Sequence, residues 1–321
     1  MLVSTGERVT MALVSMALST LGCDAVSFTG SQSGIITNDR HFDAQIIEVR
    51  PHRIEDELAR GRVVIVAGYQ GMSYRREITT LGRGGSDTTA VALAAALGAE
   101  RCEIYSDVDG IYSADPQNLA DAQHLPSIDY QTMQEMAESG AKVLNARAVE
   151  WARRNKIVIH ARKTGDFAEL AGGRETRVED ASTAQATAIV LDDKLAWVEA
   201  PATARVRLLE AAEAAGVPVR DGWFDQRVVL LLSLTSVPDF SRARQLLLDA
   251  GARDVRVDIA AVSAVAVGVG RDPARLARAL ACVPESALAT SVSPLRLSAV
   301  VPGHDAAALE RDWHALFASA L

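Results

Sequence analysis

The sequence predicts an α/β protein made of two parts with different rhythms. Over roughly the first 165 residues, short apolar runs alternate with helical patterns, which is typical of a mostly parallel sheet with helices on both faces. Over residues 186–321, the order β-α-β-β-α-β is repeated, which is typical of two ferredoxin-like modules in tandem. Residues 166–185 are small and polar and predict a linker. We therefore expect one domain at 1–165 and a second region at 186–321.

The first part begins with a helix and continues with alternating strands and helices. The opening pattern places apolar residues at Val9, Leu13 and Met16, with no strand before it. Further along, the pattern predicts a buried strand at 62–71, a helix at 88–99, a strand at 102–113, two helices over 130–156 separated near Gly140, and a strand at 157–162. Because ligands gather at the carboxyl ends of parallel strands, we expect the site residues in the loops after these strands.

The second part repeats apolar strands and amphipathic helices in a fixed order. Strands such as RVVLLLSL and VSAVAVGV alternate with the helical segments RVRLLEAAEAAG, FSRARQLLLDAG and DPARLARALACV. A βαββαβ module of this kind is more often a binding or dimerising unit than a catalytic one. The pattern therefore favours a regulatory or assembly role for this part.

Composition excludes several classes of protein. The 321 residues are 49% hydrophobic and 23% charged, as in a globular protein, and the net charge of −8 is spread along the chain. No block of Lys and Arg indicates a nucleic-acid partner, and no apolar run reaches the roughly 18 residues of a membrane span. Cys23, Cys102 and Cys282 lack CxxC or Cys/His spacing, so we expect no metal site and a reducing, cytoplasmic location.

The richest chemistry lies in TTLGRGGSDTTAVALAAALGA, residues 79–99. The glycines of GRGGSD allow a ligand close to the backbone, and Ser86 and Asp87 stand at a predicted helix start, where amide groups favour an anion. Arg83 adds a forked cation suited to a carboxylate. The alternative is a plain helix N-cap formed by Ser86 or Asp87. The stretch is not a nucleotide-binding GxxxxGK[ST] loop, because no Lys follows the glycines.

Several stretches in order carry a family resemblance. They are STGERVTMALVSMAL near the start, SFTGSQSGIIT at 27–37, GYQG, GRGGSD, CEIYSDVDGIYSADP and GAKVLNARAVEWA at 140–152. Together they resemble the aspartate kinases of the amino-acid kinase family, densely over about residues 2–165. The resemblance implies a three-layer α/β/α kinase domain followed by a pair of ACT modules, the ferredoxin-like regulatory modules of that family.

The resemblance also implies a reaction and an acceptor site. Aspartate kinases transfer the γ-phosphoryl group of ATP to the side-chain carboxylate of L-aspartate, at the start of lysine, threonine and methionine biosynthesis. Residues at the positions of Glu7, Arg83, Ser86 and Asp87 bind aspartate or organise the catalytic centre there, with Arg83 and Asp87 implied as catalytic. Tyr69, the aromatic residue of GYQG, is implied to line the amino-acid pocket.

On the nucleotide side, the resemblance implies ATP and Mg²⁺ as cofactors. Four residues are implied to bind ATP. They are Ser106, Asp107, Tyr112 of the GIYS motif and Lys142 of the GAKVL motif. Cations, amide donors and Mg²⁺ offset the repulsion between two anionic reactants. The ACT modules imply a homodimer.

The chain also departs from the aspartate kinase pattern. The Lys-Phe-Gly-Gly segment that precedes the [ST]-x-GE motif in the family has no counterpart, so we expect an N-terminally incomplete kinase domain. Gln117 replaces a usual Arg, and Asn145 and Ala146 replace His-Pro. Three interpretations stay open: an aspartate kinase whose sequence starts late or is a fragment, a catalytically inactive kinase-like subunit that binds through its ACT modules, and a kinase for another acceptor.

Overall fold

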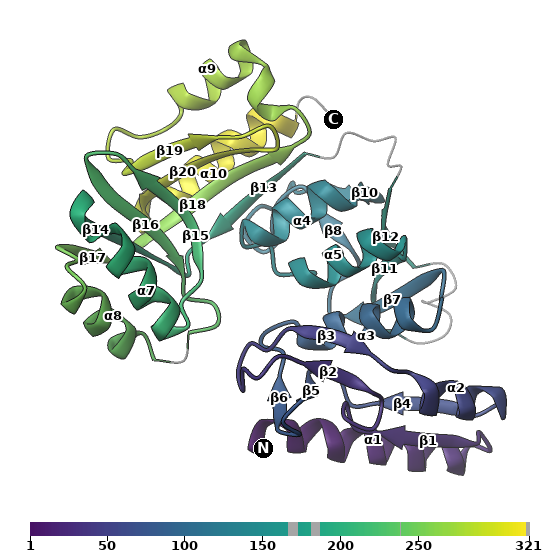
Figure 1. The fold of residues 1–321 in the computed structure, drawn as a ribbon. Helices are drawn as coiled ribbons and strands as arrows, with labels where there is room; N and C mark the ends of the chain where they lie inside the picture. Colours follow the sequence, from purple (N-terminus) through teal and green to yellow (C-terminus); the bar gives the residue numbers. More distant parts are fainter. Residues whose placement is uncertain (166–172, 181–186, 238, 319–321) are drawn as a thin grey trace. The chain divides into compact units, whose positions relative to one another are not determined.

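The chain folds into two compact units, which are described one at a time. The computed structural model describes residues 1–165, 173–180, 187–237 and 239–318 (Figure 1). The first unit contains Met1–Gly110, Pro126–Gln134 and Val143–Ser182, and the second contains Ile111–Leu125, Glu135–Lys142 and Thr183–Leu321. The α/β class is confirmed. Two short segments that the sequence placed in the first domain, 111–125 and 135–142, pack with the second unit.

The described strands of the first unit form three sheets, in which parallel and antiparallel pairs are mixed. The first sheet is a parallel pair, β1 (Ala25–Phe28) and β4 (Val63–Val66). The second has the order β3 (Ile46–Val49), β2 (Ile35–Thr37), β5 (Gln70–Ser73) and β6 (Ile78–Thr80). The third has the order β10 (Ser127–Asp129), β12 (Glu175–Glu179), β11 (Val158–Lys163) and β7 (Arg101–Ser106). The helices are α1 (Leu2–Thr20), α2 (His52–Ala59), α3 (Gly85–Ala96), α4 (Tyr130–Glu138), whose last residues belong to the second unit, and α5 (Ala146–Asn155).

Sharp backbone turns divide two of the strands that the sequence predicts. The expected strand at 62–71 becomes β4 and β5, because Tyr69 between them has a left-handed backbone with φ +67°. The expected strand at 102–113 ends at Ser106 as β7, and the chain turns through Gly110, φ +143°, before the next strand. The antiparallel pair β5–β6 follows from its connection of four residues, which is too short for a parallel crossover.

The expected linker at 166–185 contributes a strand. Residues Glu175–Glu179 form β12, which pairs with β10 in parallel and with β11 in antiparallel orientation. Val178 is fully buried and Thr176 is buried as well, so one face of this strand belongs to the unit's core. The other parts of the expected linker, 166–172 and 181–185, lie outside the described residues. The small and polar composition of the segment conceals a strand of only five residues.

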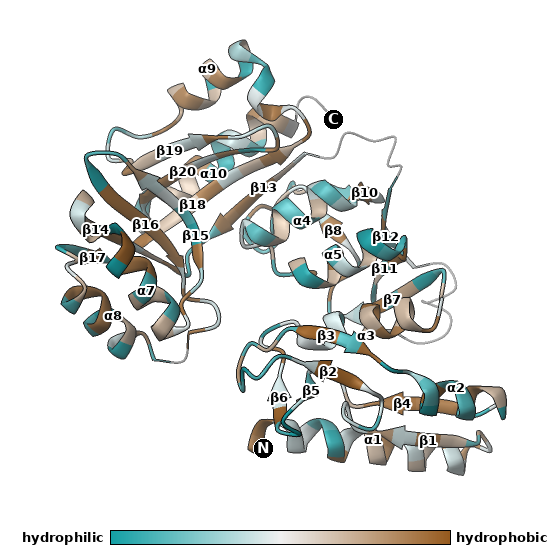
Figure 2. Ribbon diagram, viewed as in Figure 1, coloured by the Kyte–Doolittle hydropathy of each residue, from teal (hydrophilic) through white to brown (hydrophobic). Residues whose placement is uncertain are grey.

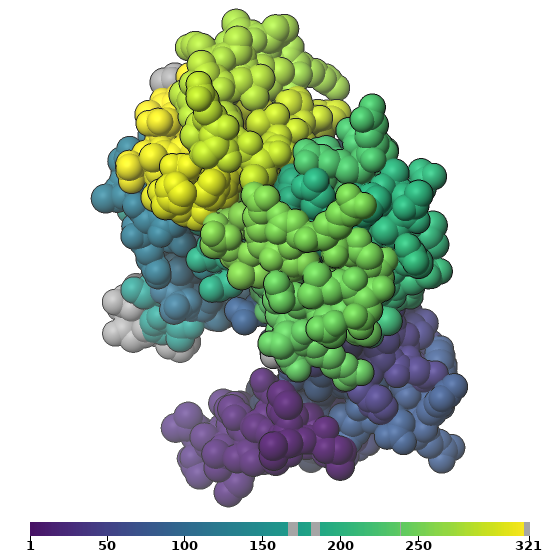
Figure 3. Space-filling view, turned by 90° about the vertical axis from the view of Figure 1, so that its left-hand side faces the viewer, coloured from purple at the N-terminus to yellow at the C-terminus, as the bar shows by residue number. Residues whose placement is uncertain are grey.

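The predicted opening helix is confirmed as α1, but its apolar residues are not buried. Val9, Leu13 and Met16 are all exposed, whereas Ser4 is buried. The purple atoms of the N-terminal segment lie at the surface in Figure 3. The helix packs beside β1 and β4. It is also joined to Gln70 on β5, whose side-chain amide donates to the Ser4 carbonyl at 3.2 Å. Of the helices that the structure describes, none combines the length and hydropathy needed to cross a bilayer.

The second unit contains two ferredoxin-like modules. In the first, a sheet of order β15 (Val219–Phe224), β16 (Arg227–Ser233), β14 (Leu195–Pro201) and β17 (Asp254–Arg256) carries α7 (Arg205–Ala215) and α8 (Phe240–Asp249). In the second, the sheet order is β13 (Thr187–Asp192), β18 (Ile259–Ala266), β20 (Arg296–Pro302) and β19 (Ala289–Val292), with α9 (Pro273–Ala281) and α10 (Gly303–Ala318). The short strands β8 (Ile111–Tyr112) and β9 (His124–Leu125) form a separate antiparallel pair in this unit.

The two modules are nested, which refines the tandem arrangement that the sequence predicts. β13 precedes the whole first module in the chain, yet it pairs with β18 of the second module, from Thr187 opposite Ala266 to Asp192 opposite Ala261. The first module is therefore an insertion between the first strand of the second module and the rest of it. Strand counts read from the sequence give two modules but do not say which strand completes which sheet.

Both faces of the module sheets are apolar. The central strands β16 and β18 appear largely brown in Figure 2. The helical face of the first module buries Val198, Leu208 and Leu230 in one cluster. A separate cluster joins the two sheets and includes Trp197 and Leu231 of the first module and Ala261 of the second. The central strands are thus buried on both faces, which explains their continuous apolar sequence.

A buried ion pair joins the modules at the edge of this apolar contact. Arg220 on β15 donates to the Asp192 carboxylate of β13 at 2.8 Å and to the Ser263 hydroxyl of β18 at 3.1 Å. The two charged side chains are only 4% and 8% exposed. Burial lowers the pKa of Arg220, and the charge of Asp192 opposes this effect. The pair is therefore a costly arrangement that depends on both partners being present.

We expect substitutions of this pair to be strongly non-additive. Arg220→Met or Asp192→Leu alone should destabilise the second unit by about 3–5 kcal/mol, because each leaves one uncompensated buried charge. The double variant Arg220→Met/Asp192→Leu should be closer to the wild type than either single variant. Chemical denaturation of all four proteins measures the coupling, and additive losses would contradict a linked buried pair.

Candidate active site

The glycine loop at 82–85 is shaped by close contacts that leave no room for side chains. Gly82 and Gly84 both have left-handed backbones, with φ +77° and +69°. A Cβ atom at Gly84 would lie 2.7 Å from Cβ and Nδ2 of Asn145, and one at Gly82 would lie 2.7 Å from Oδ1 of Asp43. The loop between β6 and α3 therefore requires these glycines for two reasons, backbone conformation and space.

Helix α3 begins at this loop without a side-chain cap. Its N-cap residue is Gly84, and neither Ser86 nor Asp87 forms the capping hydrogen bond that a plain N-cap would need. Ser86 is exposed at the first turn, next to Gly68, where an added Cβ would contact the Ser86 hydroxyl at 3.2 Å. The start of α3 thus presents amide groups and a positive dipole end, a suitable arrangement for an anionic ligand.

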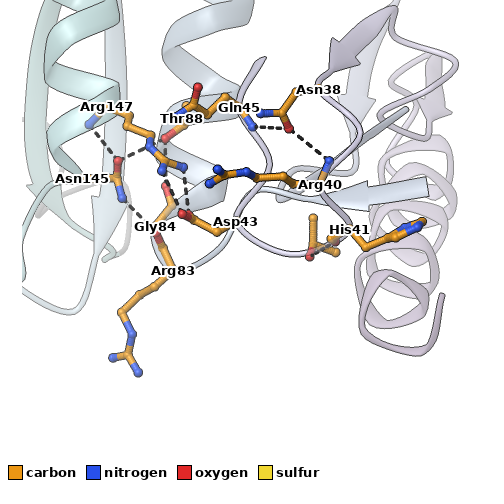
Figure 4. A network of polar contacts seen from close by, with 11 residues as sticks. Asn38, Arg40, His41, Asp43, Gln45, Arg83, Gly84, Thr88, Asn145 and Arg147 are labelled. Atoms are coloured by element: carbon orange, nitrogen blue, oxygen red, sulfur yellow. Dashed lines mark hydrogen bonds and ion pairs between the residues drawn. The ribbon is translucent and has the colours of Figure 1, made fainter. Parts of the chain in front are cut away.

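Asn145 connects the glycine loop to α5. Its side-chain amide donates to the Arg83 carbonyl at 2.8 Å, and its carbonyl oxygen accepts from the backbone N–H of Arg147 at 2.9 Å (Figure 4). The same oxygen accepts from the Thr88 hydroxyl of α3 at 3.4 Å. One side chain therefore caps α5 and fixes the backbone of the loop.

A bidentate ion pair braces this arrangement from the other side. The Arg147 guanidinium donates to both carboxylate oxygens of Asp43, at 2.9 Å each (Figure 4). Asp43 has a left-handed backbone, φ +52°, in the segment before β3. Paired forks of this kind fix orientation as well as distance. The pair places Asp43 against Gly82 and so limits movement of the loop.

Asp87 is half-buried at the first turn of α3. Burial raises the pKa of this carboxyl group, and a hydrogen bond from the backbone N–H of Asn145 opposes the rise. The pKa of the Cys102 thiol on β7 is raised to about 11 by burial and by the charges of Asp87 and Glu103. Asp87 is thus an acid kept in a partly dry environment, as functional carboxylates often are.

Arg83 is the exposed cation of the loop. Its guanidinium points away from the Asn145 cluster in Figure 4 and has no hydrogen-bond or ion-pair partner among the described residues. Its carbonyl is fixed by Asn145, so the base of the side chain is held while the charged end is free to meet a ligand. The combination suits recognition of a carboxylate or phosphate.

Tyr69, just before β5, contacts the loop, and Glu7 lies on α1. The Tyr69 ring lies against Gly85, where an added Cβ would be 3.1 Å from Cδ2, and its N–H donates to the Thr89 hydroxyl at 3.1 Å. The next residue, Gln70, accepts from Arg8 of α1 at 3.2 Å. Glu7 is half-buried on the same turn of α1, inside the helix rather than in a turn before it.

Ser106 and Asp107 lie where β7 ends. The Ser106 hydroxyl exchanges hydrogen bonds of 3.3–3.4 Å with the backbone of Val108, and Asp107 is exposed. Ser106 is paired with Lys163 at the end of the parallel strand β11. The exposed Lys163 was not a sequence candidate, and the signal for it is its place at the carboxyl end of a strand.

Tyr112 and Lys142 belong to the second unit, and the structure describes them in their own surroundings. Tyr112 on β8 faces His124 on β9, with ring centroids 5.4 Å apart in an edge contact. Lys142 is exposed in the segment between α4 and α5. The roles assigned to all nine sequence candidates remain predictions.

Sequence reasoning missed Asp43 and Arg147 and treated Asn145 only as a departure. The usable signal was Asn145 itself, because an Asn directly before an amphipathic segment is typical of a helix N-cap. The contacts of Asn145 with residues more than fifty positions away have no local signal.

A profile of the amino acid kinase family matches residues 1–162. The chain belongs to the amino acid kinase family. This confirms the resemblance seen in the sequence. The aspartokinase of Mycobacterium tuberculosis is 56% identical to this chain over 165 residues, which cover 51% of this chain and only 39% of that protein. The aspartokinase of Thermus thermophilus is 37% identical over 338 residues, covering 99% of this chain and 82% of that protein.

A solved structure is similar over nearly the whole chain. The crystal structure of Escherichia coli aspartokinase III in complex with aspartate and ADP (R-state) superimposes with a TM-score of 0.85 at 25% identity. The match covers 98% of this chain and 74% of that chain. The similarity therefore extends through both the sheets of the first unit and the ferredoxin-like modules.

The raised pKa of Asp87 predicts a pH-dependent effect of its replacement. When the pKa of an acid is higher in the folded than in the unfolded chain, the protein becomes less stable as the pH rises from the unfolded pKa to the folded pKa. Asp87→Asn removes this loss, so the variant should be more stable than the wild type near pH 7, and the difference should disappear well below pH 4. Thermal unfolding at several pH values measures it. The exposed Asp56→Asn on α2 is the control, and a pH-independent difference for Asp87→Asn would contradict the assignment.

Proposed function

We propose that this chain is an aspartate kinase, which transfers the γ-phosphoryl group of ATP to the side-chain carboxylate of L-aspartate to give 4-phospho-L-aspartate. The observation that carries the proposal is the glycine loop with its exposed, unpaired Arg83 at the uncapped start of α3. Two findings on similar proteins support the proposal. The relatives are named aspartokinases, and the E. coli structure contains aspartate and ADP. The product would feed lysine, threonine and methionine biosynthesis in the cytoplasm.

The acceptor would lie at the start of α3. Arg83 and the first amide groups of α3 would bind the carboxylates of aspartate, with the Ser86 hydroxyl as a further donor. Glu7 would receive the ammonium group, and Tyr69 would line the pocket. Asp87, with its raised pKa, would organise the first turn of α3 while Arg83 stabilises charge on the transferring group.

The nucleotide would be bound by Ser106, Asp107, Tyr112 and Lys142. A lysine ammonium provides a point charge for phosphate oxygens, and a tyrosine ring provides an apolar surface for the base. Among the described residues no group of three His, Cys, Asp or Glu is arranged to hold a metal ion. Mg²⁺ keeps several waters in proteins and would be bound chiefly by the ATP phosphates, with Asp107 as an exposed carboxylate at the end of β7. Mg²⁺ would supply charge neutralisation for the phosphates.

We assign different roles to the two parts of the chain that differ in sequence pattern. On this proposal, residues 1–165 form the kinase domain, 166–185 the connection, and 186–321 the regulatory ACT region. Segments 111–125 and 135–142, which include Tyr112 and Lys142, pack with the regulatory region although they belong to the kinase domain in sequence.

The proposed kinase should respond selectively to loss of Arg83. Hydroxamate trapping of the acyl phosphate measures activity, and Arg83→Ala should lower kcat/KM for aspartate by about a hundredfold or more, because it removes a charge-assisted contact with the substrate. The dissociation constant for ATP should change little. Arg60→Ala, at the exposed C-cap of α2, is the matched control and should behave as the wild type.

Two outcomes would contradict these assignments. Equal losses for aspartate and ATP in Arg83→Ala would remove Arg83 from the acceptor site. A wild-type chain that binds ATP and aspartate without forming an acyl phosphate would contradict the kinase activity and favour a binding subunit.

We further propose that the chain forms a homodimer through its ACT modules. β15 is an edge strand of the first module, and its exposed residues Val219 and Phe224 suit contact with a second copy. Light scattering of the wild type should give about twice the chain mass, and Phe224→Lys should shift the population to monomer. A dimer unaffected by Phe224→Lys would place the contact elsewhere.

A further inference from the structure

The segment 111–125, which carries Tyr112, is a hairpin closed by a buried serine. Ile111 and Tyr112 on β8 pair with Leu125 and His124 on β9. At the next position, the Ser113 N–H donates to the Gln123 carbonyl and the Gln123 N–H donates to the Ser113 hydroxyl oxygen, both at 2.8 Å. Ser113 is only 1% exposed. The position of Tyr112 therefore depends directly on its neighbour Ser113.

Ser113 in turn contacts a histidine of the second ferredoxin-like module. Nε2 of His314 on α10 lies 2.9 Å from the Ser113 hydroxyl, and the ring is 3% exposed. Its other nitrogen, Nδ1, lies 3.6 Å from the Asp121 carboxylate. This Ser-His-Asp arrangement is like that of a hydrolase, but a hydroxyl so deeply buried does not reach a substrate. The contact therefore positions the hairpin and is not catalytic.

Two further hydrogen bonds attach the hairpin to the same module. The Asn118 side chain donates to Glu310 on α10 at 3.5 Å, one turn before His314. The backbone N–H of Ile189 on β13 donates to the Ser113 carbonyl at 2.7 Å. Burial raises the pKa of Glu310, and the hydrogen bond from Asn118 opposes this. Polar contacts thus join the hairpin to both α10 and β13.

Apolar residues of the hairpin belong to the core of the module. Ala114 and Leu119 lie in one buried cluster with Ile189 of β13 and with Trp313 and Phe317 of α10. The hairpin is therefore packed as part of the second ferredoxin-like module and not as an independent surface loop. A shift of α10 cannot leave the hairpin unchanged, because close-packed interiors transmit displacement.

We propose that His314 is a positioning residue for nucleotide binding, through which the second ferredoxin-like module sets the place of the Tyr112 hairpin by way of Ser113. The inference rests on the proposed function, because Tyr112 is the residue that meets the nucleotide. On this proposal, α10 is the element through which a change in the regulatory region alters the affinity for ATP. By linkage, bound nucleotide stabilises the contact of α10 with the hairpin to the same extent.

The test compares variants that break the contact with one that preserves it. His314→Leu and Ser113→Ala in the full chain should each weaken the binding of MgATP, measured by calorimetry, by about tenfold, the equivalent of one buried hydrogen bond. The KM for aspartate should change less than about twofold on the same scale. His314→Gln retains a polar atom near Ser113 and should bind MgATP within about threefold of the wild type.

The matched control is Ser298→Ala, which removes a buried hydroxyl from the same module away from the hairpin. Ser298 is 3% exposed and shares a hydrogen bond of 2.7 Å with Ser263 between β20 and β18. It should lower thermal stability yet leave the affinity for MgATP unchanged. Hydrogen exchange at the amides of 111–125 should accelerate in His314→Leu and not in Ser298→Ala.

The outcomes separate this inference from the proposed function. If the wild type binds MgATP and the His314 and Ser113 variants bind it as well as Ser298→Ala does, the positioning role is overturned and the proposed kinase stands. His314→Gln binding no better than His314→Leu would also count against the role. A wild type that binds no MgATP overturns both proposals together.

Discussion

The contact between Asn145 and the glycine loop is the constraint on which the candidate site depends. The amide of Asn145 fits against Gly84 at a distance that no Cβ would allow, and it fixes the carbonyl of Arg83. Because Asn145 also caps α5 and donates its backbone N–H to Asp87, one residue sets the spacing between two helices and the loop. α3 can then begin without a side-chain cap, so its first amide groups remain available to a ligand.

In the second unit, too, contacts between segments that are distant in the sequence hold the structure together. β13 completes the sheet of the second module but precedes the first module in the chain, so the second module is formed from two separate stretches of chain. The apolar cluster around Trp197 and the buried Arg220–Asp192 pair join the two sheets, and α10 covers the hairpin that contains Tyr112. A change in one module therefore acts on neighbours that are far away in the sequence. Close-packed connections of this kind transmit a displacement from one element to the next.

Local sequence predicted the elements whose signals are local. A glycine turn and a run of Ala and Leu predict a helix at 88–99, which forms three residues earlier as α3, and Gly140 predicts the separation of α4 and α5. The start of the site at Arg83, Ser86 and Asp87 follows from the same motif. Where a strand is short or a turn is made by an ordinary residue, the local signal fails. Tyr69 breaks a predicted strand through its backbone conformation, and β12 has only five residues in a polar segment.

By itself the sequence determined the α/β class, the number of ferredoxin-like modules, the family and the motif at the start of α3, since each of these depends on residues that are neighbours in the chain or on a repeated pattern. Only the tertiary structure decided that Asp43, Asn145 and Arg147 enclose the glycine loop. It alone showed that β13 belongs to the second module and that His314 contacts Ser113, 201 positions earlier in the chain. The physical reason is that a hydrogen bond or a strand pairing between distant segments depends on how the chain is brought together, and neither partner's local sequence encodes the other.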